Sequence, residues 1–241
     1  MPWEAQARPR IRIPPGPHSH SLTRSPGCRM KIPQLDDPDL AYESGVHLGD
    51  GSLAIYRYVI SGNKKKETRY YEDVLSPLVQ DLYGVTPAIA FEYNSVYLRI
   101  YSKDLVLFKH EELGFPIGRK SELHIPSFAT SNLCSTCNVI SGLYDTDGCV
   151  KVRHDKSGNY PRISFAQAHS GLVREVKELL ASLGISSTFY RNDYYDPRIA
   201  QVETRWCLDI NGFRNYDVFA SKVGTRSPYV QERMKAIEVT R

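Results

Sequence analysis

The segment Ile140–Gly148 reads ISGLYDTDG, and the segment Glu43–Gly51 reads ESGVHLGDG, with their final Asp residues 97 positions apart. In each segment small residues recur at helical spacing, which lets two helix backbones approach closely. Each segment then ends in Asp-Gly, a pair that is typical of the end of a helix. One such pair indicates only a turn. Two in register predict two packed helices that present an Asp at the same end.

The sequence around each segment follows the same order of elements. β-Prone residues come next, at 52–60 and 149–153, and amphipathic helices are predicted over 74–84 and 172–184, each ending in Gly. Two further β-prone runs, at about 87–102 and 188–211, are followed by a third helix. The order αββαββα therefore occurs twice, which predicts an α+β fold of two repeats related by a pseudo-twofold axis.

The composition excludes several classes of protein. The 241 residues are 41% apolar, with a mean hydropathy of −0.40, so the chain is not disordered throughout. No apolar run approaches the roughly 18 residues of a membrane span, and we expect a soluble, intracellular protein without a membrane partner. The net charge of +4 is concentrated in residues 1–34, which leaves a balance of −1 on the other 207 residues. A body that binds nucleic acid must therefore segregate its charges by face.

The five cysteines argue against a disulfide framework, because their number is odd and the chain has a cytosolic character. Cys134 and Cys137 form a CxxC motif, but a zinc site would need two more ligands at a suitable spacing. We interpret them as small core residues of a helix. A disulfide between them becomes plausible only in a hyperthermophile.

The twofold axis would bring Asp50 and Asp147 together. Two neighbouring carboxylates repel each other unless a divalent cation bridges them, and hard oxygen ligands suit Mg²⁺. The chemistry that this pair indicates is attack on a phosphate by metal-activated water.

The two segments resemble the paired motifs of the LAGLIDADG homing endonucleases, in particular the single-chain, two-motif, archaeal intron-encoded type. The second segment keeps Gly142, Leu143, Asp145, Asp147 and Gly148 of the consensus. The first keeps Gly45, Asp50 and Gly51 and departs from it at Glu43, His47 and Leu48. The resemblance covers about residues 38–241. It implies two motif helices packed at the centre and antiparallel sheets that form a DNA-binding saddle.

The resemblance also implies roles for particular residues. The carboxylates of Asp50 and Asp147 would bind the metal, with the backbones of Gly49 and Thr146, and Mg²⁺ would be the cofactor, with Mn²⁺ able to replace it. Gln167 matches a catalytic polar residue at the end of an inner strand, and Asn63 is its counterpart in the first repeat. Lys103 matches a catalytic lysine between the fourth strand and the third helix, where the second repeat has Arg214.

The family lays its strands in the major groove of DNA, and this chain has suitable side chains in its β-prone runs. The residues expected to contact DNA are Tyr56, Arg57, Tyr58, Lys151, Arg153, His154, Lys156, Arg162, Tyr190, Arg191, Arg205 and Arg214. Only Ser52 to Gly62 separate the first motif from its next helix, so the first sheet is expected to be shorter and to read fewer bases.

We expect four parts along the chain. Residues 1–34 hold seven of the 15 prolines and form a disordered basic arm. The first repeat spans 35–113, a linker with two prolines spans 114–128, and the second repeat spans 129–241.

The expected function is that of a site-specific double-strand DNA endonuclease that acts as a monomer on a long asymmetric target. The alternative is an intron maturase that binds its own intron RNA; loss of a motif acid would favour it, and both acids are present. The same loss, or a fused helix-turn-helix, would favour a noncatalytic DNA-binding protein. The absence of a Cys or Ser start and of a His-Asn end argues against an intein. The expected location is the cytoplasm, with the nucleoid.

Overall fold

The computed structural model describes residues 30–155, 158–197 and 200–239. The elements of the first repeat are α1 (Pro38–Asp50), β1 (Gly51–Ala54), β2 (Arg57–Asn63), α2 (Lys64–Tyr70), α3 (Ser76–Tyr83), β3 (Ala88–Glu92), β4 (Ser95–Ile100) and α4 (Lys103–Leu107). Those of the second repeat are α5 (Leu133–Asp147), β5 (Gly148–Asp155), β6 (Gly158–Gln167), α6 (Ser170–Ser182), β7 (Thr188–Asp196), β8 (Gln201–Asn211), α7 (Phe213–Lys222) and α8 (Pro228–Val239). Short π-helical turns follow α2 and α4, at Tyr71–Leu75 and Phe108–Glu112, and a 3-10 turn at Ser127–Thr130 precedes α5.

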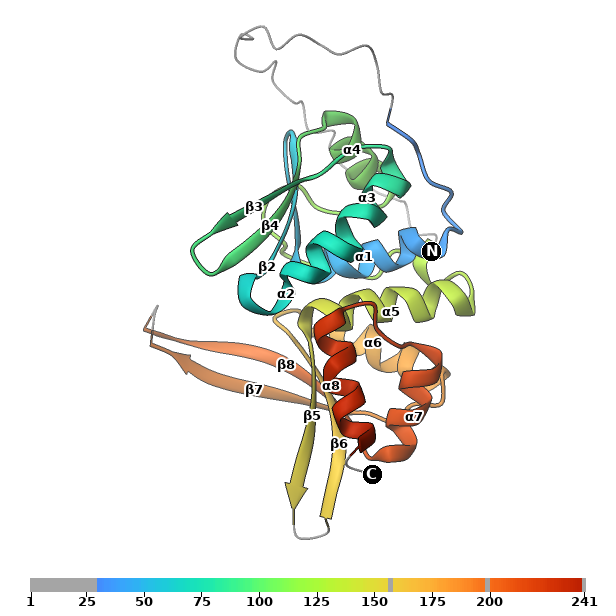
Figure 1. Cartoon of the computed structure of the whole chain (residues 1–241), viewed down its shortest axis with the longest axis vertical. Helices are drawn as coiled ribbons and strands as arrows, with labels where there is room; N and C mark the ends of the chain where they lie inside the picture. Colours follow the sequence, from blue (N-terminus) through green and yellow to red (C-terminus); the bar gives the residue numbers. More distant parts are fainter. Residues whose placement is uncertain (1–29, 156–157, 198–199, 240–241) are drawn as a thin grey trace, which may run out of the picture.

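Each repeat builds one antiparallel sheet of four strands. The strand orders are β1-β2-β4-β3 and β5-β6-β8-β7, so the two sheets have the same topology. In β4 and β6 buried residues alternate with half-buried ones, because one face of each sheet packs on helices while the other is open. The hairpins β3–β4 and β7–β8 project on the same side of the molecule (Figure 1). The predicted α+β fold of two repeats is confirmed.

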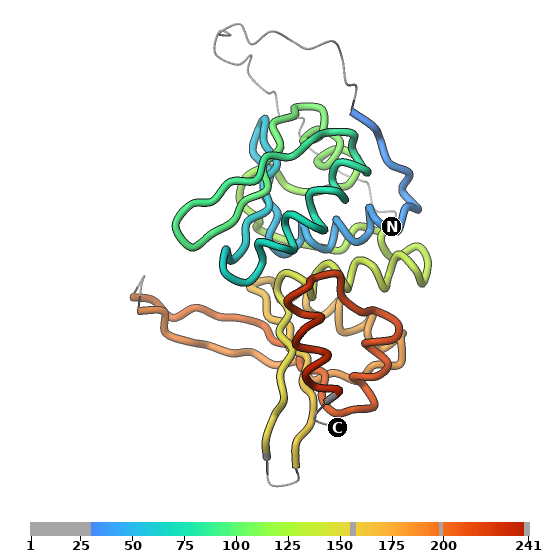
Figure 2. Tube along the Cα trace, in the orientation of Figure 1, coloured from blue at the N-terminus to red at the C-terminus, as the bar shows by residue number. Residues whose placement is uncertain are grey.

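The two repeats meet where α1 and α5 lie side by side at the centre of the molecule (Figure 2). At Gly45 a Cβ atom would lie 2.2 Å from the Val139 carbonyl oxygen, and at Gly142 it would lie 2.1 Å from the Tyr42 carbonyl oxygen. No side chain can occupy either position, so the small residues are required by the contact of the two backbones.

The first repeat differs from its prediction in the helix after the sheet. Helical structure begins at Lys64, ten residues before the expected start at residue 74, because Asn63 caps α2 by accepting from the N–H groups of Lys65 and Lys66. A π-helical turn then joins α2 to α3, which ends as predicted in Gly84 with φ of 65°. The hairpin β1–β2 is short, as expected from the chain length, although the sheet keeps four strands.

A buried ion pair holds the interior of the first repeat. Lys109 donates to Glu43 at 2.6 Å, and both side chains are fully buried. The hydroxyls of Tyr58 and Tyr83 also donate to Glu43, at 2.6 and 2.9 Å. The carboxylate is therefore satisfied by three donors, which offsets the cost of removing its charge from water.

Asp145 of the second motif fixes the C-terminal helix. Its carboxylate accepts from the backbone N–H groups of Arg226 and Ser227, at 2.8 and 3.2 Å, and from the hydroxyl of Thr225. The Tyr42 hydroxyl of α1 donates to it at 2.5 Å. The N-terminal end of a helix carries a partial positive charge, which stabilises an anion that accepts hydrogen bonds from the N–H groups there. The contact therefore joins α1, α5 and the start of α8.

Residues on either side of the repeats also pack against them. Lys31 donates its backbone N–H to the carbonyl of Tyr83 at 2.9 Å, so the end of the predicted arm lies on α3; the arm residues before Met30 lie outside the described residues. In the linker, Phe115 and Leu123 are buried, and Gly118 donates to the Leu53 carbonyl at 2.8 Å. Across all described segments, the helices are too short or too polar to cross a bilayer.

The contact between α1 and α5 gives a first prediction. Gly142→Ala should lower the free energy of unfolding by about 3 kcal/mol or more, because its Cβ would overlap the Tyr42 carbonyl. Gly171→Ala is the control, since its Cβ would find its nearest neighbour at 3.8 Å in the first turn of α6. This change should be neutral or stabilise by about 0.5 kcal/mol. Urea unfolding followed by circular dichroism measures both, and equal effects would contradict the role of the glycine contact.

Candidate functional site

Asp50 and Asp147 are the last residues of α1 and α5, and the helix contact brings these ends together. The Oδ2 atom of Asp147 lies 2.7 Å from the position that a Cβ of Gly49 would occupy. The carboxylate therefore fits against the turn before Asp50 only because that turn carries a glycine. The two predicted metal-binding acids, called the acid pair below, lie next to each other.

The surroundings of the acid pair favour its protonated form in the absence of a cation. Burial raises the pKa of Asp50 to about 8, and the charges of Asp147 and Glu67 add to this effect. Burial also raises the pKa of Asp147 to about 6, although the hydrogen bond from Gln167 and the charge of Lys120 act in the opposite direction. Negative charge in this site is thus only partly compensated by the protein itself.

Lys120, from the linker, is the lysine whose charge acts on both acids. Its ammonium donates to the carbonyls of His47, Leu48 and Gly49 at 3.0, 2.9 and 2.9 Å, where a cation interacts favourably with the C-terminal end of α1. Burial lowers its pKa to about 8. Lys120 is not among the residues expected from the sequence, because nothing in the local pattern of the linker indicates a contact with α1.

Gln167 lies where the sequence predicted it, at the end of β6. Its Nε2 donates to the Oδ2 of Asp147 at 2.5 Å. Arg205 of β8 lines the same hollow as Asp147 and Gln167, and its positive charge acts on Asp147. One predicted catalytic residue and one predicted DNA contact thus lie beside the second acid.

The structure does not bring Lys103, Asn63 or Arg214 to the acid pair. β4 runs from Ser95, opposite Asn63, to Ile100, opposite Tyr58, so it leads away from the end of the sheet that holds Asp50. Lys103 follows β4 and is exposed on the first turn of α4, without a hydrogen bond or ion pair to either acid. Arg214 lies exposed in the same place of the second repeat, and Asn63 is the N-cap of α2.

The expectation that Tyr58 contacts DNA is wrong. Its side chain is fully buried and donates to Glu43, because it faces the helices and not the open side of the sheet. Arg162 and Arg191 are engaged within the sheet, with Asp209 at 2.9 Å and Asp193 at 2.8 Å. Besides these two arginines, the expected DNA contacts that are exposed or half-buried on strands or at their turns are Tyr56, Arg57, Lys151, Arg153, His154, Tyr190 and Arg205. Lys156 lies outside the described residues.

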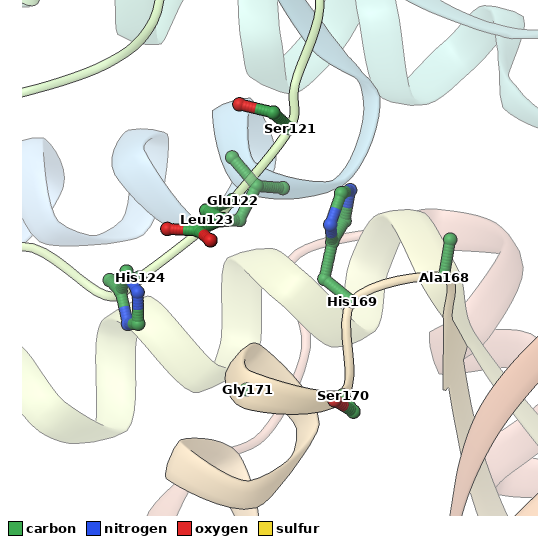
Figure 3. A pocket seen from close by; sticks show the side chains of 8 residues that line it. All are labelled: Ser121, Glu122, Leu123, His124, Ala168, His169, Ser170 and Gly171. Atoms are coloured by element: carbon green, nitrogen blue, oxygen red, sulfur yellow. The ribbon is translucent and has the colours of Figure 1, made fainter.

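A second hollow lies beside the first, between the linker and the turn from β6 to α6. Ser121, Glu122, Leu123 and His124 form one wall, and Ala168, His169, Ser170 and Gly171 form the other (Figure 3). His124 contacts Glu175 of α6, which also accepts from the Ile125 N–H at 2.8 Å. These contacts tie the segment that carries Lys120 to the second repeat.

The donor set of the acid pair fits a hard divalent cation. Its two carboxylates and the carbonyl of Gly49 are oxygen donors of the kind that Mg²⁺ prefers, and Lys120 and Arg205 compensate the negative charge of the acids only in part. Among the described residues, no three His, Cys, Asp or Glu side chains converge closely enough to hold a metal on their own. A cation here would complete its shell with backbone, water or phosphate oxygens. The described cysteines, Cys134 and Cys137 among them, are free thiols.

Comparison with known proteins agrees with this architecture. Residues 136–224 match a family model described as LAGLIDADG-like domain. The homing endonuclease I-DmoI, in mesophilic variants, is 20% identical with a TM-score of 0.57 over 79% of this chain and 97% of that chain. Its complex with DNA and Mn gives a TM-score of 0.55 at the same identity, over 79% of this chain and 98% of the other. The LAGLIDADG homing endonuclease I-GzeII in complex with its DNA target is 10% identical with a TM-score of 0.52, covering 85% and 91%.

A sequence relative comes from a different class of protein. The chain is 27% identical over 177 residues to the ribonucleoside-diphosphate reductase NrdEB subunit alpha of Bacillus subtilis (strain 168) and to the same-named subunit of Bacillus phage SPbeta. The match covers 66% of this chain but spans only 16% of the length of those curated relatives. The reductase activity of the whole relative is therefore not transferred to this chain.

The electrostatics of the acid pair give a second prediction. The pKa values of Asp50 and Asp147 in the folded protein lie above the ordinary value of 3.8, so the folded state holds their protons more tightly than the unfolded state does. The free energy of unfolding is therefore highest at low pH, where both acids are protonated in both states, and it falls as the pH rises toward 8. Without metal, the free energy of unfolding should fall by about 1 kcal/mol per unit between pH 5 and pH 7.5. Asp50→Asn should flatten this slope, and Mg²⁺ should stabilise the unmodified protein more at pH 7.5 than at pH 5. Thermal unfolding in EDTA and in Mg²⁺ measures both effects; a slope that Asp50→Asn leaves unchanged would contradict them.

Proposed function

We propose that this chain is a site-specific double-strand DNA endonuclease that depends on a divalent metal. Its residues 136–224 match the LAGLIDADG-like domain model, and its two-repeat fold is similar to that of the single-chain homing endonuclease I-DmoI. The observation that carries the proposal is the acid pair. Two half-buried carboxylates from different repeats meet at the ends of α1 and α5, between two sheets with open faces. I-DmoI and I-GzeII, which share this architecture, were solved with DNA, and I-DmoI also with Mn.

Asp50 and Asp147 would hold the metal, with the backbones of Gly49 and Thr146. A bound Mg²⁺ or Mn²⁺ supplies activated water at neutral pH and neutralises charge on the scissile phosphate. Asp50 and Asp147 must give up their protons to take part, so the raised pKa values mean that binding strengthens as the pH rises toward 8.

Three further side chains contribute to the reaction in this proposal. Gln167 orients the Asp147 carboxylate and, with its remaining amide atoms, water beside it. Arg205 faces the same hollow, where its guanidinium can bind a phosphate oxygen. Lys120 takes the place that the sequence analysis gave to Lys103, because its ammonium lies at the acid pair and stabilises negative charge there.

The open faces of the two sheets would bind the DNA grooves, and the repeats differ in reach. β7 and β8 have 9 and 11 residues, whereas β3 and β4 have 5 and 6. β5 and β6 are likewise longer than β1 and β2. Each strand residue adds roughly 3.3 Å, so the second repeat can contact more bases than the first. The target of such a protein is long and asymmetric, as expected from two unlike halves in one chain.

A third prediction separates chemistry from recognition. Asp147→Asn keeps the shape of the side chain but removes the charge that binds the metal, so cleavage of the cognate site should fall by several orders of magnitude. Binding should persist, because it depends on phosphate and groove contacts of the sheets. Asp50→Asn should act in the same way. A cleavage assay beside a gel shift tests this, and a variant that cuts at nearly the normal rate would overturn the proposal.

A fourth prediction concerns stoichiometry and metal. One chain carries both acids, so one protein molecule should occupy each DNA site, and cleavage should stop in excess EDTA and return with Mg²⁺ or Mn²⁺. Sedimentation of the complex measures the first part. Two protein copies per site, or cutting that EDTA does not reduce, would be evidence against the proposed monomeric metal-dependent nuclease.

A further inference from the structure

The two sheets place different residues beside the two acids. Gly51 pairs with Ile60 in the first sheet, and Gly148 pairs with Phe165 in the second. Two residues further along the inner strand stand Gly62 and Gln167. Gly62, and not Asn63, is therefore the structural counterpart of Gln167, and the first repeat has no side chain at the position from which Gln167 reaches Asp147.

The space above Gly62 is occupied by Glu67, which reaches back from α2. The Oε2 atom of Glu67 lies 2.2 Å from the position that a Cβ at Gly62 would take. This oxygen accepts from the backbone N–H of Asn63 at 2.6 Å, which fixes the side chain over the end of the strand. This position over the end of β2 places the carboxylate near the acid pair, and the charge of Glu67 acts on both Asp50 and Asp147.

Tyr71 adds a second observation at the same place. Its hydroxyl lies 2.7 Å from the same Gly62 Cβ position, and its side chain is 1% exposed. Within the described residues this hydroxyl has no hydrogen-bond partner, although the charges of Asp50 and Glu67 both act on it. A buried hydroxyl without a partner costs stability, which is tolerated where a ligand or a bound water supplies the missing bond.

We propose that Glu67 is the first-repeat counterpart of Gln167, a positioning residue that, together with the Tyr71 hydroxyl, orients the water ligands of a divalent cation held by Asp50. The inference rests on the proposed function, because it concerns the same metal. It makes the two halves of the centre chemically unlike. In the second half a neutral amide donates to Asp147, whereas in the first half an anionic acceptor adds a third negative charge and strengthens attraction for the cation.

The test uses Mn²⁺ alone and requires no knowledge of the DNA target. Glu67→Gln keeps the length of the side chain and an oxygen that can accept from Asn63, but it removes the charge. Isothermal titration with Mn²⁺ should show affinity lower by about tenfold or more, the usual loss when a group behind a metal ligand is changed. Without metal, Glu67→Gln should unfold at the same or a higher temperature, because one repulsion with Asp50 is gone.

Two variants control this experiment. Glu72→Gln removes the same charge from an exposed position one turn further along, and its Mn²⁺ affinity should equal that of the unmodified protein. Tyr71→Phe removes only the unpartnered hydroxyl, so it should fold at least as well and bind Mn²⁺ more weakly. It therefore tests the inference even if Glu67→Gln folds poorly.

The outcomes distinguish this inference from the proposed function. If the unmodified protein binds Mn²⁺ and Asp50→Asn abolishes binding, while Glu67→Gln and Tyr71→Phe bind as tightly as Glu72→Gln, only the inference fails. If the unmodified protein does not bind Mn²⁺, the proposed function fails and the inference fails with it. Weakening confined to Glu67→Gln and Tyr71→Phe supports the positioning role.

Discussion

The contact between the backbones of α1 and α5 is the constraint on which the rest of the structure depends. At Gly45 and Gly142 the helices approach so closely that a single methyl group would collide with a carbonyl of the other helix. The same approach continues to Gly49, against which the Asp147 carboxylate lies. Two acids that would otherwise repel each other are thus held together by packing, and the sheets that follow them are placed on either side.

The departures of the first motif from the second have physical explanations in the packing around α1. Glu43 forms the buried pair with Lys109. His47 stacks between Phe115, at 3.9 Å between ring centroids, and Tyr58, at 5.0 Å. Leu48 occupies the position that Asp145 has in the second motif. Asp145 binds the backbone just before α8, and the helices of the described first repeat, α1 to α4, include no counterpart of α8. In the first repeat, the motif helix α1 therefore makes its buried contacts with the interior of the same repeat and with the linker.

Features that repeat along the chain could be predicted from the sequence, whereas contacts between residues that are distant in sequence could not. The two Asp-Gly ends, the order of elements and Gln167 follow from local periodicity and register, so they could be predicted. Lys120 and Glu67 could not, since one comes from a linker of no regular pattern and the other replaces a side chain that Gly62 lacks. Lys103 was misplaced because its strand runs away from the acids. Tyr58 was misassigned because alternation in a strand does not reveal which face is buried.

The hydrogen bonds of Asp145 with residues 225–227 constrain the order in which the chain can fold. This carboxylate is buried in the helix that carries one acid of the pair, and its backbone donors, the N–H groups of Arg226 and Ser227, lie 81 and 82 residues further along the chain. Until those residues are in place, packing α5 on α1 buries an anion that lacks its backbone donors, which costs stability. The acid pair is therefore held firmly in place only once the distant segment 225–227 has packed against α5.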